Sequence, residues 1–215
     1  MMFEEFAAKL VFELKNQLPG FSAQNIMDPI KRKKANEYLN DTISPKKSAV
    51  LILLYPNSND SAIHVMLIIR AKSEQGNHSG QISFPGGGFD ASDIDLSDTA
   101  LRETEEEIGV DRKAIKIVGE LSPVYIPVSN YHVRPFIGIC NSRPVFQINS
   151  LEVNDLLEVE ITQFLLESNR TTSDVFLKIR NQKVQVPCYH IGGETIWGAT
   201  AMIIAEFSEV IRRIK

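Results

Sequence analysis

A glycine-rich stretch followed closely by an acidic helix constrains this chain more than any other feature of its sequence. Residues 84–88 read Phe-Pro-Gly-Gly-Gly, and glycine lets a backbone approach a bulky anion or a cation closely. Residues 95–108 have the spacing of a helix, and Gly109 is the kind of residue that ends one. The sequence therefore predicts a glycine-rich turn that leads into one well-bounded helix.

Three glutamates of this helix share one face. At about 100° per residue, Glu103, Glu106 and Glu107 fall within an arc of roughly 100°. Carboxylates at these spacings repel one another by roughly 0.2–0.5 kcal/mol per pair, whereas a divalent cation turns the same cluster into a binding site. Carboxylate oxygens suit Mg²⁺ or Mn²⁺. We therefore predict Glu103, Glu106 and Glu107 as metal ligands, with Mg²⁺ or Mn²⁺ as the cofactor.

Hydrolysis of a diphosphate is the chemistry that such a site favours. A divalent metal neutralises phosphate charge and lowers the pKa of the water that attacks phosphorus. Arg102 is predicted to steady the acidic cluster by pairing with Glu105 and Glu106, and we count Arg102 and Glu106 as catalytic. Gly86 and Gly87 are predicted to contact the substrate. A run of glutamates alone is typical of a solvated helix face, but its combination with the glycine-rich stretch is far more specific.

The rest of the chain predicts an α/β fold, with a mixed β-sheet sandwiched between helices and an N-terminal helical extension. The predicted strands are residues 48–55, 63–69, 114–121, 131–139, 175–179 and 184–189. The predicted helices are residues 3–18, 95–108 and 195–214, and residues 151–166 are predicted to be partly helical. Pro135 marks its strand as a candidate for the edge of the sheet.

Composition and charge exclude several classes of protein. The net charge of −4 gives no overall attraction to nucleic acid or to anionic membranes. The longest apolar run, residues 49–55, is too short to cross a bilayer, and the N-terminus lacks the pattern of a signal peptide. Cys140 and Cys188 lack the spacing of a zinc site, so we interpret them as buried apolar residues. We expect a cytoplasmic enzyme without nucleic-acid or membrane partners.

The acidic helix resembles the signature of the Nudix hydrolase family. That signature is Gly, five residues, Glu, seven residues, and then Arg-Glu-aliphatic-x-Glu-Glu-x-Gly-aliphatic. Its second half is matched by Arg102, Glu103, Glu106, Glu107, Gly109 and Val110. The first half departs from it, because Ile94 stands at the Glu position and Asp93 lies one residue out of register. The resemblance implies a Nudix fold and a metal-dependent pyrophosphatase.

The upstream sequence resembles the coenzyme A pyrophosphatase branch of that family. The branch carries an Asp-rich loop after its Gly-Gly, and upstream Leu-Leu-Thr-x-Arg-Ser, three residues, Arg, three residues, Gly, three residues, Phe-Pro-Gly-Gly. This signature is matched by Leu67, Arg70, Gly80 and residues 84–87. Ile68, Ala71 and Gln75 replace its Thr, its Ser and its second Arg, and one extra residue precedes Gly80. The resemblance implies coenzyme A as substrate, and 4′-phosphopantetheine and adenosine 3′,5′-bisphosphate as products.

Two residues outside the acidic helix complete the predicted site. Glu152 lies on the segment where Nudix enzymes often place a further carboxylate, so we predict it as a catalytic general base. The alternative for Glu152 is a place on a solvated helix. Arg70 ends a predicted strand near the glycine-rich stretch, and we predict that it binds the substrate.

We expect residues 1–46 to form an N-terminal helix and connector, and residues 47–215 to form a Nudix hydrolase domain. The expected activity is metal-dependent hydrolysis of a diphosphate in a nucleotide-containing small molecule, first of all coenzyme A or its thioesters. Two alternatives stay open: a pyrophosphatase for ADP-ribose, dinucleotides or damaged nucleoside triphosphates, and a non-catalytic nucleotide-binding regulator. The sequence leaves the oligomeric state open, with a homodimer as one alternative.

Overall fold

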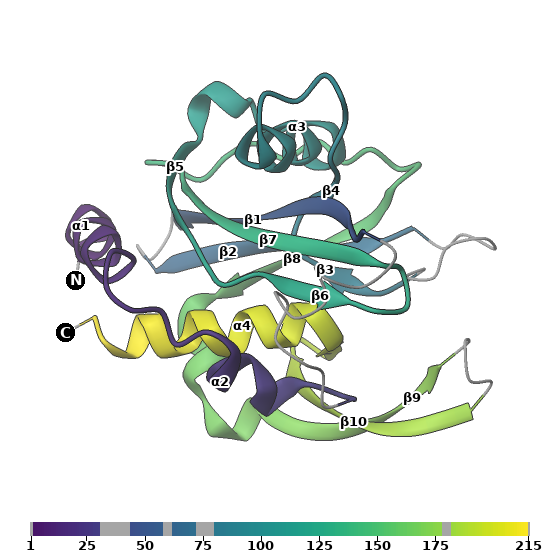
Figure 1. The fold of residues 1–215 in the computed structure, drawn as a ribbon. Helices are drawn as coiled ribbons and strands as arrows, with labels where there is room; N and C mark the ends of the chain where they lie inside the picture. The colour runs from purple at the N-terminus through teal and green to yellow at the C-terminus, as the bar shows by residue number, and fades with distance from the viewer. Residues whose placement is uncertain (1, 31–43, 58–61, 72–79, 178–181, 215) are drawn as a thin grey trace.

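A mixed β-sheet lies between two long helices (Figure 1). The protein is represented by a computed structural model that describes residues 2–30, 44–57, 62–71, 80–177 and 182–214. Helix α3 (Leu96–Ile108) covers one face of the sheet and α4 (Gly198–Arg212) covers the other. The predicted architecture, a mixed sheet sandwiched between helices, is confirmed. Gln75, from the upstream signature, lies outside the described residues.

Eight strands form the main sheet. They are β1 (Lys46–Pro56), β2 (Ile63–Arg70), β3 (Ile82–Ser83), β4 (Gly86–Gly88), β5 (Lys116–Glu120), β6 (Val124–Ile126), β7 (Tyr131–Ile139) and β8 (Val153–Glu160). The sheet runs in the order β3-β2-β1-β7-β5, while β4 pairs with β1, β6 with β7 and β8 with β2. β1 and β7 are parallel, and the other pairings are antiparallel.

The central strand β1 supplies side chains to both layers of the core. Leu51, Leu53 and Tyr55 pack on the side of α3, whereas Ile52 and Leu54 pack with α4. This alternation follows from the period of two along a strand. All five are fully buried, which explains why this segment is apolar at nearly every position.

A smaller antiparallel sheet follows the main one. It contains β9 (Arg170–Leu177), β10 (Gln182–Ile191) and β11 (Glu194–Trp197), in the order β11-β10-β9. The predicted pairing of residues 175–179 with residues 184–189 is confirmed in the described part of these strands. The closing helix begins at Gly198, later than the predicted residue 195, because residues 194–197 form β11.

The prediction that β7 lies at the edge of the sheet is wrong. β7 pairs with β1 on one side and with β5 and β6 on the other. Its Pro135 lies between the residues that pair with β6 and those that pair with β5. On the side of β7 that faces β5 and β6, the Pro135 carbonyl accepts from Leu121 N at 2.9 Å. Another residue at this position would direct its N–H to the same side, into the gap between β6 and β5, so proline leaves no strand partner without a donor. A central strand therefore tolerates this proline.

The partly helical prediction for residues 151–166 is mostly wrong. Residues 153–160 form β8, which pairs along its length with β2, and only a 3₁₀ turn, η4 (Ile161–Leu165), follows. Long-range pairing with β2 overrode the local pattern. The other 3₁₀ turns among the described residues are η1 (Asn25–Met27), η3 (Arg112–Ala114) and η5 (Glu167–Asn169).

The N-terminal segment packs against α4. It consists of α1 (Phe3–Glu13), α2 (Phe21–Gln24) and η1. α1 is shorter than the predicted residues 3–18, and its last turn tightens through bonds such as Asn16 N to Glu13 O at 3.0 Å. The buried carboxylate of Glu206 in α4 accepts from Gly20 N at 3.0 Å, from Gln24 Nε2 at 2.7 Å and from Ser122 N at 3.2 Å. One acid thus holds the N-terminal segment to the sheet layer.

Both cysteines, Cys140 and Cys188, are buried and unpaired, as their sequence context predicts. Burial raises the pKa of the Cys140 thiol to about 11. In the part of the chain that the structure describes, no helix has both the length and the apolar character needed to span a membrane.

Candidate active site

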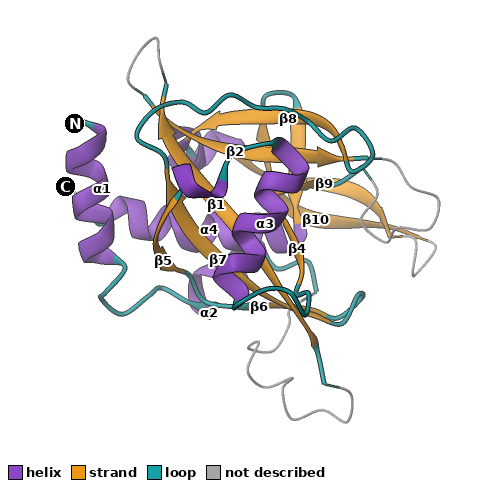
Figure 2. Cartoon of the chain, turned by 90° about the horizontal axis from the view of Figure 1, so that it is seen from above, coloured by secondary structure: helices purple, strands orange, loops and turns teal. Residues whose placement is uncertain are grey.

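Helix α3 is fixed at both ends by its own sequence. At its start, Asp95 accepts hydrogen bonds from Ser97 N at 2.8 Å and Asp98 N at 3.0 Å, as an N-cap does. At its end, Gly109 has a φ of 71° and donates its N–H to Glu105 O at 2.9 Å. Seen from above, α3 lies over β1 and beside β4, which carries the glycine-rich stretch (Figure 2). The helix therefore presents a fixed face to β4.

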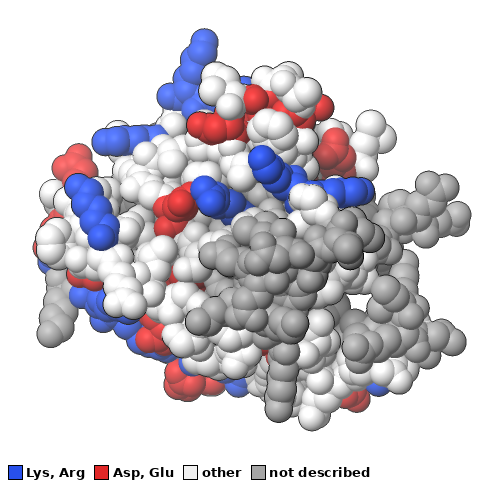
Figure 3. All heavy atoms as spheres, in the orientation of Figure 1, with Lys and Arg blue, Asp and Glu red and all other residues white. Residues whose placement is uncertain are grey.

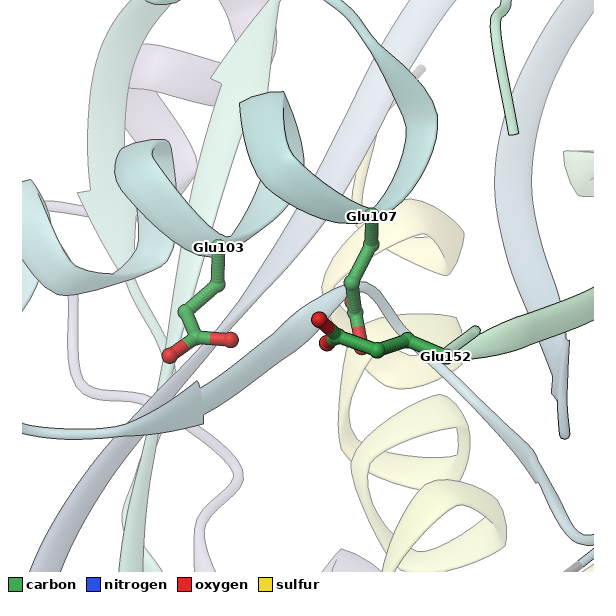
Figure 4. Close-up of side chains that lie close together, drawn as sticks. All are labelled: Glu103, Glu107 and Glu152. Carbon is green, nitrogen blue, oxygen red and sulfur yellow. The ribbon is translucent and has the colours of Figure 1, made fainter. Parts of the chain in front are cut away.

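Three carboxylates converge between α3 and the sheet. Ligand oxygens of Glu103, Glu107 and Glu152 all lie within 4.8 Å of one another. Figure 4 shows Glu103 and Glu107 pointing from α3 toward Glu152, which reaches in from the segment that enters β8. The structure thus brings Glu152 together with two of the three predicted ligands of the helix.

Glu107 is the most buried of the three. Its side chain is 1% exposed, and its carboxylate accepts from Gly86 N at 2.9 Å and from Arg70 Nη1 at 3.2 Å. Burial raises its pKa to about 7, and the negative charges of Glu103 and Glu152 act in the same direction, against the Gly86 and Arg70 contacts. Three carboxylates this close repel one another when they are ionised, and a bound cation would offset that repulsion.

The glycines of β4 make room for these acids. A Cβ atom at Gly87 would lie 2.4 Å from the carboxyl carbon of Glu103, and one at Gly86 would lie 2.3 Å from Ala49 O. Gly86 also has a φ of 150°, which side chains rarely allow. Burial raises the pKa of Glu103 as well. The bare Gly87 therefore lets Glu103 approach β4, whereas the bare Gly86 lets β4 lie close to β1.

Arg102 links the acidic loop to the helix face. It pairs with Asp93 through Nε at 2.7 Å and through Nη2 at 3.0 Å. It also donates to Glu103 at 2.9 Å and to Glu106 at 3.0 Å, so the predicted pairing with Glu106 is confirmed. The predicted pairing with Glu105 is wrong, since Glu105 accepts from Arg112 at 2.8 Å.

Asp93 is a site residue to which the sequence assigned no role. Its carboxylate is buried and also accepts from Thr99 Oγ1 at 2.8 Å. The hydrogen bonds from Arg102 hold its pKa well below the ordinary value. Asp93 lies one residue out of register with the Glu of the Nudix signature, so the signature did not predict its pairing with Arg102. Ile94, which stands at the position of that Glu, is 89% exposed. The only sequence feature that pointed to a role for Asp93 was its place in the Asp-rich loop before Arg102.

Glu106 lies apart from the three converging acids. Its side chain is 50% exposed, and its carboxylate accepts from Arg102 Nη1 at 3.0 Å. On the molecular face of Figure 3, acidic and basic side chains are interspersed. A set of hard carboxylate oxygens with this spacing suits a divalent cation such as Mg²⁺ or Mn²⁺.

Comparison with known proteins agrees with this fold. The family model of the NUDIX domain matches residues 45–160, more than half of the chain. The Nudix hydrolase NudL of Yersinia pestis (strain Pestoides F), described as uncharacterized, is 33% identical over 146 residues, which are 68% of this chain and 72% of that protein. NudL of Yersinia pseudotuberculosis serotype O:1b (strain IP 31758) has the same values.

A solved structure agrees with the fold alone. The MutT/nudix family protein from Enterococcus faecalis has a TM-score of 0.52 at 16% identity, over 91% of this chain and 76% of that chain. Together with the family match, fold and site define a hydrolase. The chain belongs to the Nudix family. It acts on nucleotide substrates that contain a diphosphate, and enzymes of this family generally need a divalent metal.

Proposed function

We propose that this protein hydrolyses the diphosphate of coenzyme A or its thioesters, giving 4′-phosphopantetheine and adenosine 3′,5′-bisphosphate. The observation that carries the hydrolytic part is the convergence of Glu103, Glu107 and Glu152 within 4.8 Å. The choice of coenzyme A is supported by the upstream signature. Its residue Leu67 is buried in β2, and Arg70, at the end of the same strand, contacts Glu107. Two parts of that signature, β2 and β4, thus meet at the acids.

We assign Mg²⁺ or Mn²⁺ to the glutamates of α3, with Glu103, Glu106 and Glu107 as ligands. Glu103 and Glu107 are supported by their shared cluster, and Glu152 adds a third oxygen donor there. Glu106 lies one contact away, through Arg102. When bound, the metal supplies positive charge against the phosphates and lowers the pKa of the attacking water.

The remaining roles fall to the chain's own groups. Glu152 is the most exposed acid of the cluster, which supports its assignment as the general base that takes a proton from water. Arg102 orients the acids through its contacts with Glu103 and Glu106. The backbone of Gly86 and Gly87 carries no side chains that would keep a diphosphate away.

Arg70 is proposed to bind the substrate. Its side chain is 33% exposed, and Nη1 bonds to Glu107 at 3.2 Å. A guanidinium has five N–H donors, so Arg70 can keep this contact and meet a phosphate oxygen with another donor.

The proposed division of the chain places an N-terminal helix and connector in residues 1–46 and the Nudix hydrolase domain in residues 47–215. Small nucleotide diphosphates are the proposed partners, in the cytoplasm, without nucleic acid or membranes, and with a homodimer as one alternative for the assembly.

A substrate panel tests the proposal. Coenzyme A, dephospho-coenzyme A, ADP-ribose, NADH and 8-oxo-dGTP are incubated with Mg²⁺ or Mn²⁺, and the products are identified by mass. We expect the highest kcat/KM with coenzyme A, and about ten- to hundredfold less without its 3′-phosphate, because a charge-assisted bond contributes roughly 1.5–3 kcal/mol. A better rate with dephospho-coenzyme A or ADP-ribose would overturn the choice of coenzyme A and leave the Nudix hydrolase intact.

A further inference from the structure

The connection between β7 and β8 is attached to the end of α3. Gln147 N donates to Ile108 O at 2.9 Å, and Asn149 N donates to Glu107 O at 3.0 Å. These carbonyls belong to the last turn of the helix, where they have no partner within it. A Cβ atom at Gly109 would lie 2.8 Å from Gln147 Cβ, so the bare glycine allows this close approach. The segment that carries the third acid is thereby held next to Glu107.

Asn149 closes the turn that leads to Glu152. Its carbonyl accepts from Glu152 N at 3.0 Å and from Val153 N at 2.9 Å. Its side-chain oxygen Oδ1 accepts from Leu151 N at 3.2 Å. Its side-chain nitrogen Nδ2 donates to Glu152 Oε1 at 3.2 Å. One residue therefore contacts the main chain of Glu107 and the carboxylate of Glu152.

We infer that Asn149 is a positioning residue, which aims the Glu152 carboxylate at Glu103 and Glu107. Glu152 is exposed, and a free glutamate there would gain rotamer freedom and turn away from two like charges. The Asn149 amide opposes this rotation with a neutral donor, so it adds no charge to the cluster. It occupies one carboxylate oxygen and leaves the other to a cation. The inference rests on the proposed metal site.

Mn²⁺ affinity of the full chain, measured by electron paramagnetic resonance with MnCl₂ alone, tests this role without any substrate. We expect Asn149→Leu, which keeps the size of the side chain and removes its donor, to bind Mn²⁺ about tenfold more weakly. This is the lower end of the loss found when partners of metal ligands are removed. The matched control is Asn141→Leu, at the exposed far end of the same connection, with wild-type affinity expected.

A second variant separates the amide from the turn. Asn149→Ser keeps an oxygen that can accept from the Leu151 amide but is too short to reach Glu152. We expect the same weakening as in Asn149→Leu, whereas wild-type affinity in Asn149→Ser would overturn the inference. Thermal unfolding of each variant is followed in parallel to confirm that the protein is folded.

A double-mutant cycle tests whether Asn149 acts through Glu152. In a Glu152→Ala background, adding Asn149→Leu should change the Mn²⁺ affinity by less than about twofold, because the carboxylate that Asn149 contacts is already absent. Equal losses in both backgrounds would contradict the inference. If the wild-type protein binds no Mn²⁺, the proposed metal site itself fails. If it binds Mn²⁺ and Asn149→Leu binds it equally well, only the role of Asn149 fails.

Discussion

At the scale of single residues, neighbouring acids of α3 have different surroundings. Glu107 is buried and bonded to β4 and Arg70, Glu106 is half exposed and bonded to Arg102, and Glu105 pairs with Arg112 away from the cluster. A run of three glutamates thus divides into three environments because successive helix positions are rotated by about 100°.

We expect Glu107→Gln and Glu106→Gln each to lower kcat by at least ~10²-fold at saturating Mg²⁺, since both remove negative charge assigned to the metal site. Steady-state kinetics with coenzyme A or the best substrate of the panel measures this. Glu105→Gln is the matched control, with activity close to wild type. Full activity in both test variants would refute the assignment of the metal to α3.

The close approach of β4 to Glu103 gives a second prediction. A Cβ atom in Gly87→Ala would displace the Glu103 carboxyl, which lies 2.4 Å from that position. Because this moves a proposed metal ligand, we expect kcat/KM to fall by at least ~10-fold, which is about 1.4 kcal/mol of transition-state stabilisation. At Gly88 the nearest atom is Tyr131 Oη at 3.6 Å, so Gly88→Ala should retain its rate. Equal activity of the two variants would contradict this account of Gly87.

At the scale of elements, α3 was predictable because its signals are local. The cap at Asp95, the apolar flank and the terminal Gly109 all lie within the helix or beside it, and the predicted residues 95–108 agree with the observed helix to one residue. β8 was not predictable in the same way. Its pairing with β2 depends on residues far away in the sequence, and the charged positions of residues 151–166 resemble those of a solvated helix.

The contact between α3 and β4 makes metal-free stability depend on pH. Because burial raises the pKa of Glu107 to about 7, from an ordinary 4.5, the folded protein binds this proton more tightly than the unfolded chain does. The stabilisation is fully present below about pH 4.5 and is lost as pH rises through 7. At about 1.4 kcal/mol per pKa unit, the loss is about 3 kcal/mol.

Urea unfolding in EDTA between pH 4.5 and 8 measures this loss. We expect the free energy of unfolding of the wild type to fall across the window relative to that of Glu107→Gln, which has no proton to lose. Mg²⁺ should reverse the loss in the wild type, because a cation favours the carboxylate. Parallel pH curves for the two proteins would be inconsistent with a raised pKa at Glu107.

At the scale of the whole molecule, Glu206 joins three segments that are distant in the chain. Its donors come from the N-terminal segment and from Ser122, which lies between β5 and β6, and burial raises its pKa. Phe6, Leu10 and Met27 share the core cluster of α4. Only the tertiary structure brings these groups together. Sequence spacing placed Glu103 and Glu107 on one helix face, but it could not predict their meeting with Glu152 or the contacts of Glu206.

We expect Glu206→Gln to lower the free energy of unfolding by about 2 kcal/mol, because the Gln amide turns a donor toward groups that are themselves donors. For a protein of this size the melting temperature should fall by about 4–8 °C. Glu209→Gln, in the same helix and paired only at the surface with Arg212, should change it by no more than about 2 °C. Calorimetry measures the melting temperature of both variants, and equal values would rule out a special role for Glu206.

The burial of both cysteines has a practical consequence for spectroscopy. Since neither Cys140 nor Cys188 reaches the surface and the thiolate is the reactive form, a maleimide should leave the folded wild type unmodified. A single introduced thiol, Leu151→Cys at a position 87% exposed beside Glu152, would then take up a nitroxide alone. Its broadening by nearby Mn²⁺ would report the distance from label to ion in an otherwise native background.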